Sequence, residues 1–342
     1  MADKKVLGVQ KLGFQWQTED PFLITMYHND KYPAGNEEQG PNVSLAGRNL
    51  GEDFTLRDGF RMYHGTIVPG FPAHPHRGFE TVTVVLKGFV DHFDSKGSAG
   101  RYGEGDVQWL TTGNGCQHTE MFPLVYKDRP NPLELFQIWL NLPSKNKSAD
   151  PEYKMLWAED IPVVESSNSA GKKTAIKVIA GTTQGIASLE PNSASWAKDR
   201  THHVGIYHIQ MEPGATLVLP AVSDTLNRNL YFYGGESITI GDEIIPTSHR
   251  VKLAGDQEIT VTNGTKESNF LLLEGEPIGE PVAQYGPFVM TTEQEIRDTF
   301  REYQRTQFGG WQWGRLDPVH ERNAERFAQY ADGRIEKPRG QV

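Results

Sequence analysis

Short apolar runs, separated by glycine, proline and polar residues, dominate the pattern along the chain. In the first half they are TVTVVLKGFV (81–90), DVQWLTT (106–112) and LFQIWLNL (135–142); in the second half they span 204–211, 216–222, 229–235 and 269–275. Runs of this length that are rich in β-branched and aromatic residues and end at turn residues predict β-strands. The chain has 35 glycines and 21 prolines, so turns are frequent. The pattern therefore predicts an all-β fold.

A helical pattern stands out only near the C-terminal end, in residues 291–308 (TTEQEIRDTFREYQRTQF). Ile296, Phe300 and Tyr303 recur there at helical spacing, and Thr291 or Thr292 is placed to cap the start with a glutamate shortly after it. Residues 311–342 form an extension with helix-like and polar stretches. Two outcomes remain open for this extension, since it could wrap a domain or end in disorder.

Glycines follow the predicted strands at similar positions in the two halves of the chain. A predicted strand ends at Gly88 and is followed by Gly105-Asp106, and in the second half a strand ends at Gly235 and is followed by Gly255-Asp256. A length of 342 residues also favours two domains over one. We therefore predict two similar β-barrels in tandem, at 1–150 and 151–310, followed by the C-terminal extension at 311–342.

Two short runs in the first half carry candidate metal ligands. These are His74-Pro-His76 and His118-Thr-Glu120, in which the polar residues stand two positions apart. This spacing places both side chains of a pair on one face of a strand. Adjacent strands with such pairs can direct three imidazoles and one carboxylate at a single ion, which in an octahedral site keeps two open positions. From the residues alone, hydrogen-bonded histidines in a barrel are the alternative.

The second half lacks such residues at the positions that a simple count makes equivalent. Aligning Gly88 with Gly235 places Ala221 and Ser223 opposite the first histidine pair. Aligning Gly105 with Gly255 places Ser268 and Phe270 opposite His118 and Glu120, with a shift by a gap as the alternative. None of the four is a common metal ligand. The count assigns the metal to the N-terminal domain and predicts a C-terminal domain without metal ligands, with a structural, interface or lid role.

Other residues with potential chemistry are better explained by structure. Glu80 is expected in a position behind the ligands or at the surface, with direct ligation as the alternative. Cys116 is interpreted as a small buried residue, with redox sensitivity as the alternative. His202 and His203 have no carboxylate at a matching spacing, and we expect no metal there.

The charge of the chain narrows the classes of partner. The formal net charge is −10, and the sequence contains no long basic run, which argues against broad electrostatic binding of nucleic acid or anionic membranes. The N-terminal segment lacks the apolar core of a signal peptide, and no apolar stretch approaches the roughly 20 residues that span a bilayer. A single cysteine fits a reducing compartment. We expect a soluble cytoplasmic protein.

Three segments carry a resemblance to a known family. HPHRGFETVTVVLKG (74–88), GDVQWLTTGNGCQHTEM (105–121) and EPVAQYGPFVM (280–290) resemble the pirin family of bicupins, in this order and over roughly residues 20 to 310. The resemblance implies two tandem cupin barrels of jelly-roll type and a monomer. It further implies one iron-type ion (Fe2+/Fe3+) held by His74, His76, His118 and Glu120, with other divalent metals as alternatives.

Two functions follow from this resemblance. The first is a metal-dependent dioxygenase of the quercetin 2,3-dioxygenase type, acting with dioxygen on a flavonol-like or other small aromatic enol substrate. Glu120 would then be both a ligand and the general base for the substrate hydroxyl. The alternative is an iron-containing redox-sensing regulator that binds a protein partner, either a transcription factor or a metabolic enzyme.

Overall fold

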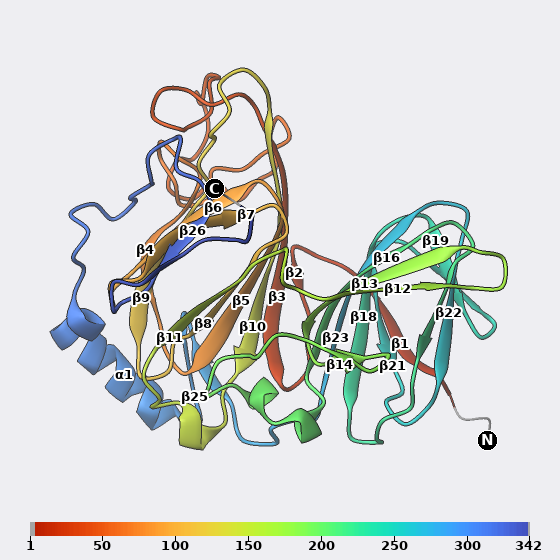
Figure 1. Cartoon of the computed structure of the whole chain (residues 1–342). Coiled ribbons are helices and arrows are strands. Elements are labelled where there is room, and N and C mark those ends of the chain that lie inside the picture. The colour runs from red at the N-terminus through yellow and green to blue at the C-terminus, as the bar shows by residue number, and fades with distance from the viewer. Residues whose placement is uncertain (1–3, 341–342) are drawn as a thin grey trace. The chain divides into compact units, whose positions relative to one another are not determined.

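The structure is a computed structural model that describes residues 4–340, and its chain divides into two compact units (Figure 1). Unit A comprises Met26–Glu159 and the chain from Glu280 onward. Unit B comprises the chain up to Thr25 and Asp160–Gly279. The third strand, Phe22–Tyr32, starts in unit B and continues in unit A.

Unit A is built from two antiparallel sheets. The first has the strand order β11-β8-β5-β10-β3, and the second has the order β27-β26-β7-β6-β9-β4. The strands are β3 (Phe22–Tyr32), β4 (Gly70–His76), β5 (Phe79–Lys87), β6 (Phe89–Asp94), β7 (Ala99–Gly103), β8 (Val107–Thr111), β9 (Cys116–Met121), β10 (Asn131–Asn141), β11 (Glu152–Leu156), β26 (Phe327–Gln329) and β27 (Ile335–Glu336), with a hairpin of β24 (Ala283–Tyr285) and β25 (Phe288–Met290).

Unit B is also built from two principal sheets, with the orders β1-β21-β18-β23-β16-β13-β12 and β17-β22-β19-β20. The strands are β1 (Val6–Lys11), β12 (Val163–Ser167), β13 (Lys173–Ala180), β16 (Gly205–Met211), β17 (Thr216–Leu219), β18 (Asn227–Gly234), β19 (Ser237–Ile240), β20 (Glu243–Pro246), β21 (His249–Leu253), β22 (Ile259–Asn263) and β23 (Ser268–Gly275), besides the short strands β2 (Gln15–Trp16), β14 (Thr182–Thr183) and β15 (Ile186–Ala187).

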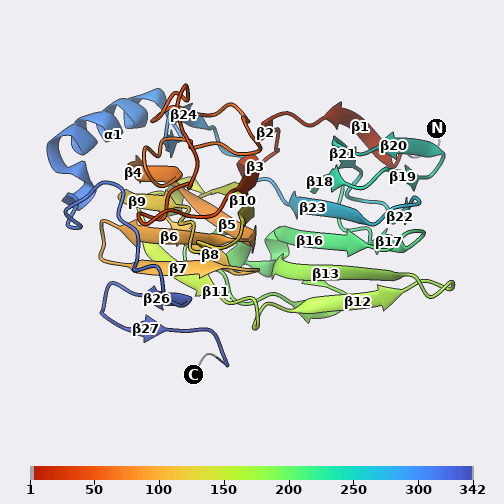
Figure 2. The same cartoon turned by 90° about the horizontal axis from the view of Figure 1, so that it is seen from above.

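The two units share one topology of eight strands. Strands β3 to β10 of unit A and β16 to β23 of unit B follow the same chain order, and their pairings correspond throughout: β4 with β9 matches β17 with β22, and β5 with β10 matches β18 with β23. Figure 2 shows the strands of each unit from above. The predicted all-β fold with two tandem cupin-type domains is confirmed, although the sheets do not close into continuous barrels.

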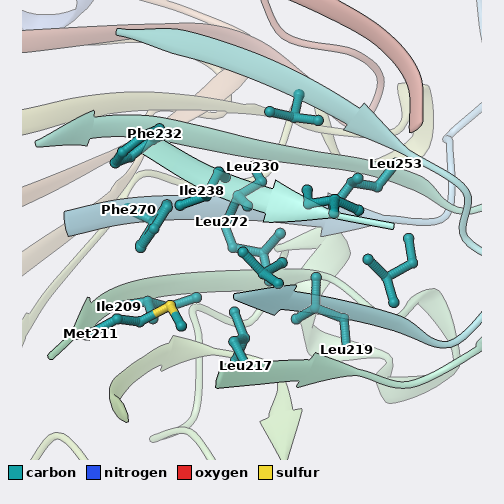
Figure 3. Packing of buried hydrophobic residues seen from close by; sticks show 14 of the residues in the cluster. Ile209, Met211, Leu217, Leu219, Leu230, Phe232, Ile238, Leu253, Phe270 and Leu272 are labelled. Carbon is teal, nitrogen blue, oxygen red and sulfur yellow. The ribbon is translucent and has the colours of Figure 1, made fainter. Parts of the chain in front are cut away.

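Apolar side chains fill the space between the sheets of each unit. In unit B, residues of facing strands such as Leu217, Leu230 and Leu272 pack together (Figure 3), and each is at most 3% exposed. Unit A has its own cluster, which includes Val85, Leu110 and Cys116. The alternation of buried and exposed residues along β22 (BeBeB) shows why these runs form strands with one buried face.

The predicted C-terminal helix is confirmed as α1, Glu293–Thr306. Thr292 caps it, accepting from the Glu295 backbone nitrogen while the Glu295 carboxylate accepts from the Thr292 nitrogen, which makes a capping box. The extension after α1 packs on unit A, where β26 pairs with β7; its last two residues lie outside the described part. Within residues 4–340, no helix is long and apolar enough to cross a membrane.

Candidate metal centre in unit A

Strands β4 and β9 bring three histidines of the sequence motif together. The strands pair antiparallel with His74 opposite His118 and His76 opposite Cys116. The ring centres of His74, His76 and His118 lie 4.5 to 5.0 Å apart, and one ring nitrogen of each lies within 4.8 Å of those of the others. Ligand atoms about 2.1 Å from one ion are at most about 4.2 Å apart. Small ring rotations would therefore suffice for three bonds to a shared ion.

Strand β4 is at the edge of its sheet, which explains how it tolerates two prolines. In the sheet order, β4 pairs only with β9. Pro72 and Pro75 lack a backbone N–H, and such residues are accommodated on edge strands because one side of the ladder is unused. Gly78 follows at a φ of 87°, where a β-carbon would lie 1.9 Å from the Val289 carbonyl oxygen. The sharp turn after His76 thus requires glycine.

Backbone carbonyls orient two of the imidazoles. His74 Nδ1 lies 2.8 Å from the Pro72 oxygen, and His76 Nδ1 lies 3.4 Å from the Pro287 oxygen. A carbonyl oxygen only accepts, so each Nδ1 carries the proton and each Nε2 keeps its lone pair for a ligand. Burial lowers the pKa of His74 to about 4 and the pKa values of His76 and His118 well below the ordinary value. All three rings are therefore neutral at physiological pH, the form that binds metals.

His118 provides the test of whether the site fits a metal. Its side chain is fully buried, and neither ring nitrogen has a hydrogen-bond partner. Leaving a buried polar group without a partner costs about 1–3 kcal/mol. A metal ion bound to one of these nitrogens would remove part of that cost. Three neutral imidazoles, of which His118 has no hydrogen-bond partner, fit a divalent ion.

Glu120 lies next to the three histidines but is held by its own partners. Its Oε2 atom is 3.8 Å from His118 Nε2, which is too long for a hydrogen bond. Gln137 Nε2 donates to both carboxylate oxygens at 2.8 and 2.7 Å, and Thr83 Oγ1 donates to Oε1 at 3.0 Å. Burial raises the pKa of Glu120, and these hydrogen bonds offset part of the rise. The carboxylate is thus oriented and more basic than an exposed one.

A small cavity of about 140 Å³ opens beside the histidines and Glu120. Its other walls come mainly from apolar and aromatic side chains on β3, β4 and β10, including Phe71, Leu135 and Trp139. Trp139 packs against His76, with ring centres 5.3 Å apart. The cavity thus combines apolar and aromatic walls with the imidazoles of His74 and His76 and the Glu120 carboxylate, an arrangement suited to an aromatic ligand.

Four residues of a hydrogen-bonded polar chain near this cavity were not predicted from the sequence. His28 lines the cavity, and its Nδ1 lies 2.7 Å from the Tyr63 hydroxyl, which donates to Asp30 Oδ2 at 2.6 Å. Arg61 Nη1 donates to Asp30 Oδ1 at 3.1 Å. Since Tyr63 donates its proton to Asp30, His28 Nδ1 donates to Tyr63. His28 and Asp30 stand two positions apart, as do Arg61 and Tyr63, so this spacing was the available signal.

His92 is a second group that the sequence analysis missed. It stands on β6 opposite Glu120 of β9, is fully buried, and has its ring centre 5.5 Å from that of His118. Its Nε2 lies 3.3 Å from Asp94 Oδ2, and its ring stacks on Tyr153. The alternation of His92 and Asp94 in the run FVDHFD was the available signal.

The remaining sequence candidates are now placed. Glu80 is fully buried, so the expectation of a surface position is wrong, and its Oε1 accepts from Trp109 Nε1 and Thr111 Oγ1 instead of joining the histidines. Cys116 is buried, and burial raises the pKa of its thiol, as expected for a small core residue. His202 stacks on Trp196.

The count that placed residues of unit B opposite the metal motif needs correction. The equivalents of β4 and β9 are β17 (TLVL) and β22 (ITVTN). Ser268 and Phe270 stand on β23, the equivalent of β10, and Ala221 and Ser223 follow the end of β17. The count failed because the loops of the two units differ in length. Neither β17 nor β22 contains histidine or a carboxylate.

Comparison with known proteins gives consistent matches. The family described as Pirin matches residues 15–140, and the Pirin C-terminal cupin domain matches residues 206–309. Pirin-1 of Arabidopsis thaliana is 37% identical over 300 residues, covering 83% of this chain and 97% of its own length. A pirin-like protein of Solanum lycopersicum is 36% identical over 238 residues, covering 69% and 75%.

A solved structure extends the likeness to three dimensions. The crystal structure of a quercetin 2,3-dioxygenase from Acinetobacter baumannii is similar with a TM-score of 0.68 and 25% sequence identity. The match covers 90% of this chain and 99% of that one.

Proposed function

Because the chain belongs to the pirin family, we propose that unit A holds one divalent metal ion, iron by preference, between His74, His76, His118 and Glu120. We propose further that the site catalyses oxidation of a small aromatic enol by dioxygen, in the manner of a quercetin 2,3-dioxygenase. The observation that carries this proposal is the fully buried His118, without a hydrogen-bond partner, beside two oriented neutral imidazoles and an apolar cavity.

A bound iron ion would supply a Lewis acid for the enol oxygen and a redox partner for dioxygen. Residues of the chain do the rest. Glu120 Oε2 is the acceptor for the enol proton, since the carboxylate is next to the histidines and its basicity is raised by burial. Gln137 and Thr83 hold this carboxylate in place, and Trp139 lines the cavity in which the substrate ring would lie.

The size of the cavity bears on the substrate. At about 140 Å³ it is smaller than the roughly 300 Å³ at which pockets for drug-sized ligands begin. It has room for a single ring with its enol and carbonyl oxygens. This favours a one-ring enol, or a flavonol that enters only by its chelating end.

The test compares two substrates on one protein. The full chain is loaded anaerobically with Fe2+ and mixed with air-saturated buffer containing quercetin or a one-ring 3-hydroxy-4-pyranone. Dioxygen consumption is followed for both substrates, and visible absorbance for quercetin. We expect turnover that requires iron and is faster for the one-ring substrate. Consumption no faster than in the His118→Ala protein, with either substrate, would refute the enzymatic proposal. The alternative of redox-dependent binding to a protein partner stays a prediction.

A further inference from the structure

Unit B contains a cavity of about 270 Å³ to which no function has been assigned. Strands β16, β23 and the end of β17 supply apolar walls through Ile209, Leu272 and Leu219. In the shared topology these strands are the equivalents of β3, β10 and β4, which line the cavity beside the histidines in unit A. An apolar cavity of about 150 Å³ is enough to hold benzene. The cavity of unit B is therefore large enough for one substituted ring.

Glu274 places a carboxylate at this apolar wall. It shares one face of the sheet with Leu272, its neighbour on β23, and with Tyr207 on β16, and all three line the cavity. Gly205 stands directly opposite Glu274, and a β-carbon there would lie 2.9 Å from Glu274 Cγ and 2.3 Å from Tyr207 Cε2. Glycine at this position thus leaves room for both side chains at the wall.

One oxygen of the Glu274 carboxylate is occupied and the other is not. Arg228 Nε, on the paired strand β18, donates to Oε2 at 2.6 Å. Within residues 4–340, no group donates to Oε1, and the Glu274 side chain keeps 12% of its surface exposed. Arg228 is fully buried and is not among the lining residues, so it balances the carboxylate from behind. The cavity thus offers a hydrogen-bond acceptor whose charge is already compensated.

The charged lining residues favour a neutral ligand. Lys198 and Arg200 both pair with Glu190, and Glu274 is the second carboxylate, so that two cations and two carboxylates line the cavity. This balance attracts neither an anion nor a cation. An ion would also lose its hydration against the apolar walls without gaining a full counter-charge. The ligand group that meets Oε1 is therefore an uncharged donor.

A phenolic hydroxyl is the donor that suits these walls best. An O–H group that donates to a carboxylate forms a short bond, about twice as strong as one between neutral groups, and a phenol is a stronger donor than an aliphatic alcohol because it is more acidic. Tyr207 gives the cavity an aromatic wall, and its hydroxyl is fixed by Thr182, whose nitrogen donates to it at 3.1 Å and whose oxygen accepts from it at 3.2 Å. A fixed aromatic side chain packs well against a ring.

We propose that unit B contains a second, metal-independent binding site for a small neutral phenol. The phenolic hydroxyl donates to Glu274 Oε1, and the ring packs on Tyr207 and on the leucine and isoleucine side chains of β16, β17 and β23. The site does not depend on the metal of unit A or on the proposed oxidation.

Calorimetric titration of the metal-free full chain with p-cresol tests the site. The matched control ligand is 4-fluorotoluene, which has nearly the same shape and carries fluorine in place of the hydroxyl. We expect saturable binding of p-cresol, and the ratio of the two affinities measures the hydrogen bond. Binding should be the same in the His118→Ala variant, because the site lies in unit B. Loss of binding in that variant would place the ligand in unit A and overturn the proposal.

Two variants assign the binding to this cavity. Arg228→Met combined with Glu274→Leu removes both charges together, so that neither is left buried alone, and should lower the affinity ratio of p-cresol to 4-fluorotoluene about tenfold or more. Val222→Trp narrows the cavity from its partly exposed lining and should weaken both ligands while leaving their ratio unchanged. An unchanged ratio in the double variant, undiminished binding in Val222→Trp, or no binding of p-cresol to the native chain would overturn the proposal.

Discussion

Units A and B use the same eight-strand framework for different chemistry. In unit A, β4 and β9 carry three histidines and a glutamate, whereas the equivalent strands β17 and β22 of unit B read TLVL and ITVTN. Leu217 and Leu219 of β17 stand opposite Val261 and Ile259 of β22 and are buried in the apolar core. The framework therefore does not determine the site; a few side chains on two paired strands do.

The largest expected effect is the loss of bound metal when a histidine of unit A, and not one of unit B, is replaced. His118→Ala removes the central candidate ligand. Loss of a residue that only orients a ligand lowers metal affinity by up to about 100-fold, and we expect loss of a ligand to lower the metal content after loading and desalting by more than this. His208→Ala, which removes a buried histidine on β16 of unit B, is the matched control. Elemental analysis measures both. Equal metal content in the two variants would show that the metal is not held by His118.

A smaller effect is expected from the group that orients Glu120. Gln137→Leu removes both hydrogen bonds to the carboxylate and should lower metal affinity or turnover about 10- to 100-fold. Gln210→Leu makes the same change on β16 of unit B, where the amide donates to Asn269. Metal titration monitored by competition with a chelator gives the affinity. If Gln137→Leu behaves like Gln210→Leu, Glu120 needs no positioning by its neighbour.

Acid should destabilise unit A of the metal-free protein. Burial lowers the pKa of His28 to about 3, below the ordinary 6.5, so the folded state binds the proton less well than the unfolded state. Its stabilising contribution is complete above pH 6.5 and is lost as the pH falls toward 3. One such group changes the free energy of unfolding by up to about 1.4 kcal/mol per pH unit.

Hydrogen exchange with mass spectrometry resolves this acid effect by unit. In the native chain, the protection of peptides from β3 and β9 should decrease as the pH is lowered. His28→Gln should make this decrease less steep, because it removes one of the buried groups that take up a proton on unfolding. Peptides from β17 and β22 of unit B are the internal reference. An unchanged slope in His28→Gln would mean that His28 does not contribute to the acid sensitivity.

The smallest effect concerns the helix cap in unit A. Thr292→Ala removes the side-chain acceptor for the Glu295 backbone nitrogen and should lower the free energy of unfolding by about 1 kcal/mol. Thr260→Ala, at an exposed position of β22 in unit B, is a control expected to change stability by less than about 0.5 kcal/mol. Urea unfolding gives both values. A loss in Thr292→Ala no larger than in the control would show that the cap adds nothing to stability.

The sequence contains the local part of this structure and little of the long-range part. Short apolar runs between turn residues predict the strands, and the two-residue spacing predicts that His74 and His76 share a face, because both are properties of neighbouring residues. The sequence division at residue 150 gives no sign that β1 pairs with β21. Partners such as Gln137 for Glu120, or Tyr63 for His28, come from other segments of the chain, and their identity depends on long-range packing that no local pattern records.

The position of β4 at the sheet edge has a kinetic consequence. Beyond its ladder with β9, Ala73 on its outer side donates a backbone hydrogen bond to Leu316 of the C-terminal extension. Detaching two candidate ligands therefore requires breaking the ladder with β9 and single hydrogen bonds to neighbouring loops, such as those of Ala73 with Leu316 and of His76 with Pro287, and leaves the apolar core of unit A in place. The rate at which a bound ion exchanges with solution would then be set by fraying of this edge strand. A mutation could therefore change the rate of metal release without changing the rate of global unfolding.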